Sequence, residues 1–467
     1  MKTRAILSNM GIVLQMAGIF IVLPIILSFY YNELSATIAL FLAAITFLVL
    51  GFFMNTLAEK VKLNYKQSCT LIVLVFILMS LIGAFPYIYV NISQGDIVQN
   101  ITDSVFESAS GYTTTGFSVI QNVTALPKSI VFYRALTQFI GGIGIVLVLL
   151  AFFYPDVELT EFARSMGFGK NHKIKRAFFL VLVIYLVYTL VMSILGIVFG
   201  YPDIIQLISF IFSALSTGGF TPINNITTVA TNPPLNVILI LSMILGAINF
   251  FVLAGLFKAK FKEFLKSETT VFLVMAAFSV TIVIVFFQLS FFDALFQIIS
   301  TMSTAGFSYL SIADFTDGLK LFLIFLMFVG GASLSTAGGI KIYRFLLILK
   351  ATKKAIIESI TQKETKPLTL FGREYSNGDV NQAMIIVFLM IGIIFSSTFI
   401  VSYYGFQPIN ALFDCTSALA TTGLSAGVVG PSLALELKWF FVFLMIIGRV
   451  EILAFFIVFS RVKEEAS

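Results

Sequence analysis

Charged residues are scarce in this sequence of 467 residues, where Asp, Glu, Lys and Arg together make up 11%, against roughly 25% in soluble globular proteins. Hydrophobic residues reach 59%, and a soluble fold has too little polar surface to cover so many of them. A bilayer, in contrast, solvates an apolar exterior directly. The composition therefore excludes soluble enzymes and nucleic-acid-binding proteins and predicts an integral membrane protein. The net charge of +6 then reflects loops on two membrane faces rather than a nucleic-acid partner.

Two reactive residue types are almost absent. The two cysteines, Cys69 and Cys415, cannot build a disulfide framework. The single histidine, His172, lies in a basic run, where a solvated loop residue is expected rather than a ligand or proton relay. The sequence also offers no nucleophile–base pair, metal-ligand cluster or phosphate-binding glycine loop, so we expect no enzyme activity and no cofactor in this chain.

Ten apolar stretches approach the roughly 20 residues that cross a bilayer. With the N-terminus inside the cell, only four of the 29 basic residues fall outside: Lys128, Arg134, Lys320 and Lys438. The positive-inside rule then predicts a multi-pass protein of the plasma membrane with both termini cytoplasmic and with lipid around it. The stretches lie at residues 12–31, 36–54, 68–89, 129–153, 177–199, 235–256, 269–287, 319–350, 382–403 and 433–459.

A short pattern recurs four times on the predicted outer face, centred on Gly116, Gly219, Gly306 and Gly423. Each copy has a serine six residues before the glycine, a threonine two before it, and a serine or threonine two after it. The recurrence predicts four units of span, short re-entrant helix, glycine turn and span. A polar residue thirteen before each glycine is expected at the start of the re-entrant helix: Asp103, Gln206, Asp293 and Asn410.

Non-helical backbone at membrane depth is tolerated only where it is buried in protein or lines a water-filled cavity. Glycine permits backbone angles that aim carbonyl groups inward, and a ring of carbonyls can replace the hydration shell of a monovalent cation. We therefore expect a selectivity filter built from the backbones of Thr114, Thr115, Gly116, Thr217, Gly218, Gly219, Thr304, Ala305, Gly306, Thr421, Thr422 and Gly423. The alternative is that the small residues only pack helices together.

Two features of the later spans point to a permeation path. Glycine pairs at 330–331 and 338–339 interrupt the eighth span and lower its helix propensity, so the freed backbone is expected to line the path, unless it is a close-packing helix face. Arg449, two residues before Glu451, lies inside the last span and either marks an ion path or forms a structural Arg–Glu pair. For Arg134 we expect snorkelling to the outer face or a structural hydrogen bond.

Residues 68–461 resemble the Trk/Ktr/HKT family of cation transporters through the four turns and through the segments 132–144, 246–251, 330–341 and 448–451. The two extra spans before residue 68 resemble the TrkH/TrkG branch. The resemblance implies an all-α polytopic membrane protein with about ten transmembrane helices, in which four pseudo-symmetric units surround one central pore. The expected parts are the two extra helices at 1–66 and pore units at 67–170, 171–266, 267–375 and 376–467.

The resemblance also implies roles for residues and partners. Glycine in all four turns goes with potassium in this family, whereas serine in the first goes with sodium in some plant relatives, so Gly116 favours K⁺ as the transported ion, bound only at the filter. A homodimer and a cytoplasmic, TrkA-like nucleotide-binding regulatory subunit are expected partners. The expected gate consists of Gly331, Ala332, Ser333, Leu334, Ser335, Thr336, Ala337, Gly338 and Gly339, with Arg449.

Two classes of function remain open. The first is K⁺ uptake through a channel-like pore, driven by the membrane potential. The second is a symporter that couples K⁺ to H⁺ or Na⁺, with a sodium-permeable transporter as a variant. Fourfold rather than inverted twofold repeats, and the lack of an obvious intramembrane carboxylate or histidine relay, count against symport. Four glycosylation sequons, at Asn91, Asn100, Asn122 and Asn225, all lie in segments expected outside.

Overall fold

The structure, a computed structural model, describes residues 2–56, 63–93, 95–148, 174–224, 226–250, 252, 264–265, 267–362 and 367–460. His172 and the sequon asparagine at 225 lie outside these residues. Within them the chain is almost entirely helical, and the described strands are the three-residue pair β1 (Leu368–Leu370) and β2 (Arg373–Tyr375), which run antiparallel. The expected all-helical class is therefore correct.

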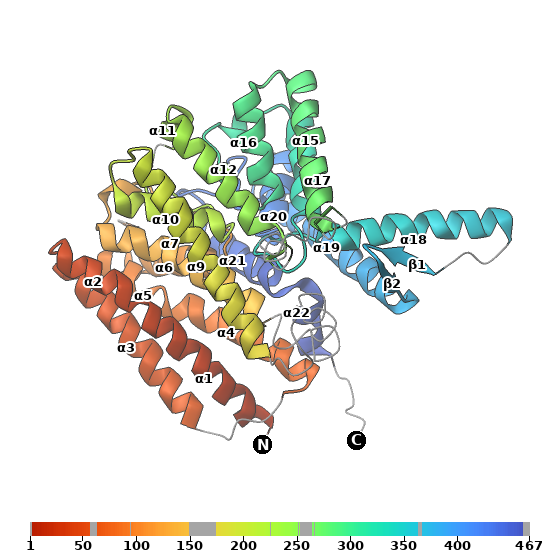
Figure 1. Cartoon of the computed structure of the whole chain (residues 1–467). Coiled ribbons are helices and arrows are strands. Elements are labelled where there is room, and N and C mark those ends of the chain that lie inside the picture. The colour runs from red at the N-terminus through yellow and green to blue at the C-terminus, as the bar shows by residue number, and fades with distance from the viewer. Residues whose placement is uncertain are drawn as a thin grey trace.

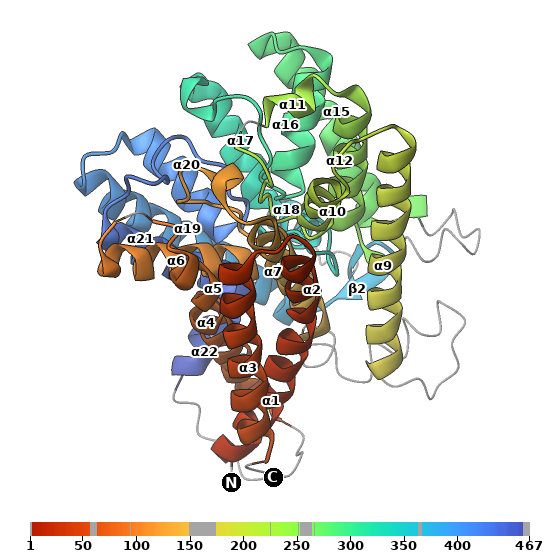
Figure 2. The same cartoon turned by 90° about the vertical axis from the view of Figure 1, so that its left-hand side faces the viewer.

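An N-terminal hairpin precedes the four glycine turns. Its helices are α1 (Lys2–Phe20), α2 (Val22–Tyr30) and α3 (Leu34–Thr56), with α1 lying along α3 (Figures 1 and 2). The buried face of α3 includes Ala36, Ala39 and Ala43, and such small side chains let membrane helices approach closely. At the hairpin tip, the Glu33 carboxylate accepts hydrogen bonds from the backbone N–H groups of Lys128 (2.6 Å) and Ser129 (3.0 Å) at the start of a later helix.

Four successive segments follow, each centred on a short helix that ends at a glycine turn. The first contains α4 (Tyr65–Ile82), α5 (Phe85–Val90), α6 (Ile97–Tyr112) and α7 (Lys128–Val148). The second contains α9 (Ile174–Val198), α10 (Ile204–Leu215), α11 (Thr227–Ala230) and α12 (Pro233–Ala247). The third contains α15 (Glu268–Phe287), α16 (Phe291–Met302), α17 (Asp317–Val329) and α18 (Ile342–Thr361), followed by β1 and β2. The fourth contains α19 (Asn377–Tyr403), α20 (Pro408–Leu419), α21 (Leu435–Val450) and α22 (Ile452–Phe459).

The short helices α6, α10, α16 and α20 share one packing arrangement. Each contacts the helices before and after it in its own segment and also the helix that follows the turn of the preceding segment. Thus α10 contacts α9, α12 and α7, and α20 contacts α19, α21 and α17. The series closes on itself, because α6 contacts α4, α7 and α21. The four turns are consequently brought to the middle of the helical body.

Three of the four polar residues expected at the start of the short helices lie there: Gln206, Asp293 and Asn410 are each in the first turn of their helix. The capping side chains lie just before them, because Asp96, Asp203 and Ser290 each accept a backbone N–H at the start of α6, α10 and α16. Asp103 is the exception, because α6 begins at Ile97 and Asp103 lies deeper in the helix, where it is buried and binds Lys438.

Each of the ten expected spans overlaps helix within the described residues, but not all are continuous. Among the described residues, five helices are long and apolar enough to cross a bilayer, or six if the bent pair α21 and α22 forms one span. The predicted break in the eighth span is present, since α17 ends at Gly330 (φ 71°) and α18 begins at Ile342. The tenth span, predicted as one apolar stretch over residues 433–459, bends by 102° between α21 and α22. The number of spans therefore stays a prediction.

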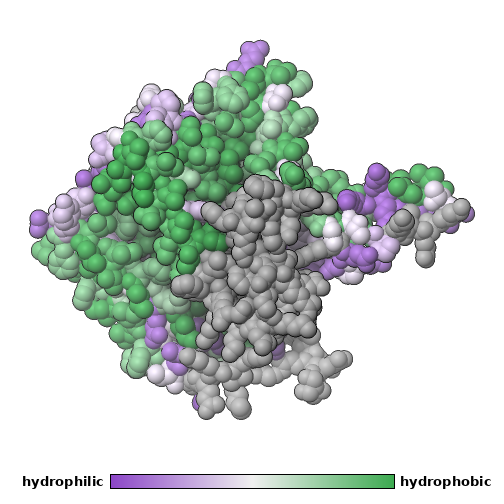
Figure 3. Space-filling view, viewed as in Figure 1, coloured by the Kyte–Doolittle hydropathy of each residue, from purple (hydrophilic) through white to green (hydrophobic). Residues whose placement is uncertain are grey.

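The outer surface of the helical body is apolar. Phe388 and Phe399 are 77% and 76% exposed, and hydrophobic residues cover broad areas of the face in Figure 3. Polar residues gather at the upper and lower ends of the body and on α18, which projects from it (Figures 1 and 3). Such an apolar band is what lipid contact requires, so the protein is a membrane protein.

Candidate functional site: four glycine turns around a buried centre

The four glycine turns, residues 114–116, 217–219, 304–306 and 421–423, share an uncommon backbone conformation. Their threonines all adopt the left-handed region, with φ of 52° at Thr114, 52° at Thr217, 55° at Thr304 and 49° at Thr421. A β-branched residue is strained there, so four cases at matched positions indicate a backbone fixed by its surroundings. The glycines two residues later also have positive φ, between 78° and 92°.

Each turn is anchored to the short helix that leads into it. The N–H of the residue before the glycine donates to the carbonyl of the serine six before the glycine: Thr115 to Ser110 (2.9 Å), Gly218 to Ser213 (2.8 Å), Ala305 to Ser300 (2.9 Å) and Thr422 to Ser417 (2.8 Å). The recurring serine therefore marks a helix end that is closed by the turn itself. In the first segment the Ser110 hydroxyl also accepts from the N–H of Gly116.

The glycines show that the four turns touch one another in a closed ring. A Cβ placed on Gly116 would overlap the carbonyl oxygen of Gly218, and one on Gly219 would overlap that of Ala305. The same holds for Gly306 against Thr422 and for Gly423 against Thr115. All twelve residues expected in the filter thus lie together, and at these four positions only glycine fits the carbonyl of the next turn.

Several side-chain oxygen atoms in this ring have no hydrogen-bond partner among the described residues. They are the buried hydroxyls of Thr114, Thr421 and Thr422, although buried polar groups are normally hydrogen-bonded. Unpartnered oxygens and close-set carbonyls are hard ligands, which suit water or an alkali cation. Among the described residues, no group of three His, Cys, Asp or Glu side chains could hold a metal ion.

The segment between α17 and α18, residues 330–341, lies against the turns. Its Gly338 N–H donates to the Thr304 hydroxyl (2.6 Å), and the hydroxyls of Thr217 and Thr336 are 3.3 Å apart. Thr336 also binds the carbonyls of Leu215 (3.0 Å) and Gly246 (2.9 Å). The expected gate residues are therefore next to the turns, and the alternative of a close-packing helix face is wrong because this segment is not helical.

Arg449 is buried and bound to this segment. Its Nη1 donates to the carbonyl of Thr336 (2.9 Å) and its Nη2 to that of Gly141 (3.0 Å). The structural Arg–Glu pair considered for it is wrong, because Glu451 binds Nη2 of Arg344 at 2.8 Å. Glu451 lies beyond the break in the last span (φ 68°), which turns its side chain away from the helix that carries Arg449.

Arg134 does not reach the outer face. It is 1% exposed and forms a buried ion pair with Glu107, while its Nη1 donates to the Thr221 carbonyl at 3.0 Å. For Arg134, snorkelling to the outer face was therefore wrong, and the alternative of a structural hydrogen bond is confirmed. Three carboxylates are buried as well, those of Asp103, Glu107 and Asp414. Each is engaged by lysine, arginine, serine or backbone N–H groups.

The sequence analysis did not identify the side chains of the short helices that bind the residues two after the glycines. Nine residues before the glycine, Glu107, Gln297 and Asp414 accept hydrogen bonds from Ser118, Ser308 and Ser425, which lie two after it. Extending the repeat alignment by three residues would have revealed this polar position. Asn100, one of the sequon asparagines, is 7% exposed and donates to the Ile88 carbonyl (2.9 Å), so its amide is not accessible for glycosylation.

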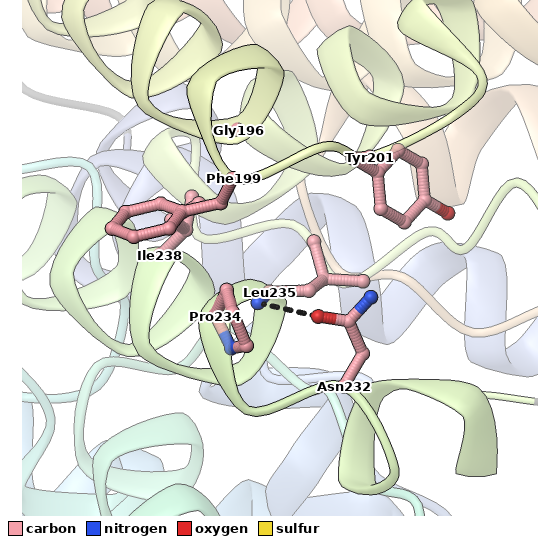
Figure 4. A pocket seen from close by; sticks show the side chains of 7 residues that line it. All are labelled: Gly196, Phe199, Tyr201, Asn232, Pro234, Leu235 and Ile238. Atoms are coloured by element: carbon pink, nitrogen blue, oxygen red, sulfur yellow. Dashed lines mark hydrogen bonds between the residues drawn. The ribbon is translucent and has the colours of Figure 1, made fainter.

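A surface hollow elsewhere holds no comparable chemistry. It lies between α9 and α12 and is lined by Phe199, Tyr201, Asn232 and Leu235 among others (Figure 4). The Asn232 side chain there caps α12 by accepting from the Leu235 N–H at 3.2 Å. With a volume of about 10 Å³, the hollow has room for roughly one water molecule. The glycine turns remain the candidate site.

A polytopic helical body with an apolar exterior and a ring of backbone turns at its centre belongs to the class of membrane transport proteins. Residues 35–291 and 267–467 match the family described as TrkH, cation transport protein. The chain belongs to this family, and it is an ion transporter rather than an enzyme.

Individual relatives agree with this assignment. The chain is 30% identical to an uncharacterised cation transporter of Methanocaldococcus jannaschii over 98% of this chain and 95% of that protein. It is 25% identical to the Trk system potassium uptake protein TrkH of Escherichia coli over 86% of each chain. The crystal structure of the potassium transporter TrkH from Vibrio parahaemolyticus has the same fold, with a TM-score of 0.83, 22% identity and 99% of each chain covered.

Proposed function

We propose that this protein mediates potassium uptake across the plasma membrane through a channel-like pore. The observation that carries the proposal is the closed ring of four glycine turns, in which each turn places a carbonyl against the glycine of its neighbour. Four pseudo-symmetric units of span, re-entrant pore helix and span would surround this ring. Potassium is proposed as the transported ion because several TrkH relatives are named potassium uptake proteins.

In this proposal, K⁺ binds at the twelve turn residues, whose carbonyl oxygens take the place of its hydration shell. The turns do not have to reorganise around the ion, because their backbones are fixed by the short helices and, in the first, third and fourth turns, by the polar side chains nine residues before the glycines. A preorganised ring favours one ion size over another, and the four glycines argue for K⁺ over Na⁺. The filter requires no cofactor in this chain.

The segment 331–339, with Arg449, is proposed as the gate. Thr336 stands between Arg449 and Thr217, so this segment lies in line with one of the turns. The guanidinium group of Arg449 adds positive charge beside the segment and would oppose a cation at that level until the segment moves. Both termini would be cytoplasmic. A homodimer and a nucleotide-binding regulatory subunit are proposed partners that would act on this gate from the inner side.

Complementation of a potassium-auxotrophic host tests the function. Expression should restore growth at low K⁺, more strongly when a TrkA-like subunit is co-expressed, and the purified protein in liposomes should take up K⁺ in response to an inside-negative potential. No growth in either strain together with no K⁺ flux would overturn the proposal. A fixed stoichiometric movement of H⁺ or Na⁺ with K⁺ would establish the symporter instead.

A further inference from the structure

The turn of the second segment is held differently from the other three. Where the first, third and fourth short helices carry Glu107, Gln297 and Asp414 nine residues before the glycine, the second carries Phe210, which is fully buried and has no polar atom. The side chain that would fix the residue two after the glycine is therefore absent from α10. An unsupported turn would leave its backbone N–H and C=O groups without partners, which is costly in a buried site.

Gln138, on α7 of the first segment, replaces the missing support. Its Nε2 donates to the Gly218 carbonyl at 2.5 Å, and its Oε1 accepts from the Phe220 N–H at 3.1 Å. One side-chain amide thus holds the residues on both sides of Gly219. Gln138 is completely buried, so no water competes for these two hydrogen bonds.

Arg134, one helical turn earlier on α7, links the same turn to the first. Its Nη1 donates to the carbonyl of Thr221, and its guanidinium lies 4.2 Å over the ring of Phe220. The opposite edge of the guanidinium binds Glu107 through Nε at 2.9 Å, and Glu107 in turn accepts from Ser118 of the first turn. The first and second turns are consequently joined by a continuous buried chain of charge-assisted contacts.

In the second and fourth segments, apolar side chains stand where α7 carries Gln138 and Arg134. Gly141, Gly246 and Gly448 occupy equivalent places, because a Cβ on each would overlap the carbonyl of the last residue of its short helix. Three residues before them lie Gln138, Met243 and Met445, and seven before them lie Arg134, Leu239 and Phe441. All six side chains are buried, so the difference is one of chemistry and not of exposure.

We infer that Gln138 is a specificity-determining positioning residue: by clamping Gly218 and Phe220 it sets how well the second turn distinguishes K⁺ from Na⁺. The inference rests on the proposed function. The Gly218 carbonyl lies at the place that a Cβ on Gly116 would fill, so its position affects two of the four turns. A carbonyl group held by an amide donor cannot move inward to contact a smaller ion, whereas a released carbonyl group can. Its release therefore strengthens the binding of Na⁺ more than the binding of K⁺.

The test compares Gln138→Met with Met445→Leu, which is the matched change at the equivalent place in the fourth segment. Methionine has nearly the length of glutamine but neither donates nor accepts strongly. In liposomes containing equal amounts of folded protein, Gln138→Met should lower the ratio of K⁺ to Na⁺ uptake by about fivefold or more, the effect of one ordinary buried hydrogen bond. Met445→Leu should leave this ratio unchanged. A purely structural role would reduce both fluxes together.

Gln138→Glu provides a second variant, because it retains an acceptor for the Phe220 N–H and removes the donor to Gly218. An unchanged ratio in folded Gln138→Met and Gln138→Glu, or the failure of both to fold, would overturn the inference. The proposed function is judged separately by the wild-type protein in the same liposomes. If the wild type moves no K⁺, the function fails; if it does and the variants keep its ratio, only the role of Gln138 fails.

Discussion

Threonine and glycine have different roles at each turn, and their backbone angles explain why both residues recur. The threonine ends the short helix with a left-handed residue, and the glycine two positions later makes room for the carbonyl of the next turn. A serine at Gly116 would meet the Gly218 carbonyl and would also have to adopt a φ near 92°, which side chains disfavour. The backbone must therefore shift at the centre of the ring.

Gly116→Ser is expected to reduce the preference for K⁺ over Na⁺ while some transport remains, because one of four turns is displaced. Gly306→Ser should act in the same way, since a Cβ there overlaps the Thr422 carbonyl. Gly430→Ser is the control, because open space surrounds a Cβ at Gly430. Uptake of K⁺ and Na⁺ by equal amounts of protein measures the preference. The assignment of the filter would be abandoned if neither turn variant changed it.

Arg449 offers a second test at the level of one residue. Its removal takes away a positive charge, one hydrogen bond to Thr336 in the segment 330–341 and one hydrogen bond to Gly141 on α7, but leaves the turns untouched. Arg449→Ala should raise basal K⁺ flux, with the ratio of K⁺ to Na⁺ preserved. Arg449→Lys, which retains the charge but not the paired donors, should lie between the alanine variant and the wild type. A changed ratio of K⁺ to Na⁺ uptake with an unchanged basal K⁺ flux would contradict a role of Arg449 at the segment 330–341 rather than at the turns.

At the scale of elements, the interrupted eighth span depends on contacts with neighbouring helices. Segment 330–341 is held by a few specific contacts: the Ala332 N–H donates to Ala247 (3.0 Å), the Ser333 N–H to Glu268 (2.7 Å) and the Thr336 N–H to Gly246 (3.1 Å). A helix of the same length would satisfy its backbone internally, whereas here the partners lie on α12 and α15. Displacing those helices would therefore displace the segment.

Deletion of residues 333–337 is expected to increase basal flux if the segment occludes the pore, because these residues include Thr336, which lies against Thr217 and Arg449. Flux into liposomes and the amount of protein at the cell surface are measured together. A variant that reaches the surface and keeps wild-type, still regulated flux would contradict the gate. Loss of the protein from the membrane would instead indicate that the segment serves packing.

The sequence predicted the elements that depend on local patterns and missed those that depend on distant partners. The glycine turns and the break in the eighth span follow from repeated small residues, and both are present. Gly448 lies three residues before the bend at Glu451, but a single glycine within a helical pattern does not predict a break. The bend is accompanied by the pairing of Glu451 with Arg344, more than a hundred residues away. Arg134 and Asp103 were misjudged for a similar reason, because Arg134 pairs with Glu107 on a neighbouring helix of its own segment and Asp103 pairs with Lys438 of the last segment, and both pairs become visible only when the helices pack together.

For the whole molecule, the decisive contact is the one that joins the last segment to the first. The Lys438 amino group on α21 binds the Asp103 carboxylate on α6 at 2.5 Å, and both side chains are almost completely buried. The contact between the third and fourth segments is similar but has a neutral acceptor, because Lys320 on α17 donates to the Asn410 side chain on α20 at 2.9 Å. In both contacts, the acceptor lies thirteen residues before the turn glycine, and the lysine lies on the helix that follows the turn of the preceding segment.

These contacts predict unequal effects on stability. Lys438→Met leaves a buried carboxylate unpaired, which costs about 3–5 kcal/mol, whereas Lys320→Met leaves a neutral amide, which costs about 1–3 kcal/mol. Thermal unfolding in detergent should therefore show a larger fall in the midpoint for Lys438→Met, and Asp103→Asn should restore part of the loss. Equal shifts for the two lysine variants would mean that closure of the ring does not depend on the ion pair.

The orientation of the whole molecule in the bilayer decides which side the turns face and which side a regulator can reach. The loop after the first turn carries Gln121, and α18 carries Lys353; both residues are exposed and lie on opposite sides of the predicted topology. Cys69 and Cys415 are buried, so the wild-type protein should not react with a membrane-impermeant maleimide. A cysteine in place of Gln121 should be labelled on intact cells, whereas one in place of Lys353 should be labelled only after permeabilisation. Labelling of the Lys353 site from outside would reverse the orientation, place the segment 330–341 on the outer side of the turns, and remove the basis for its action as a gate controlled from the cytoplasm.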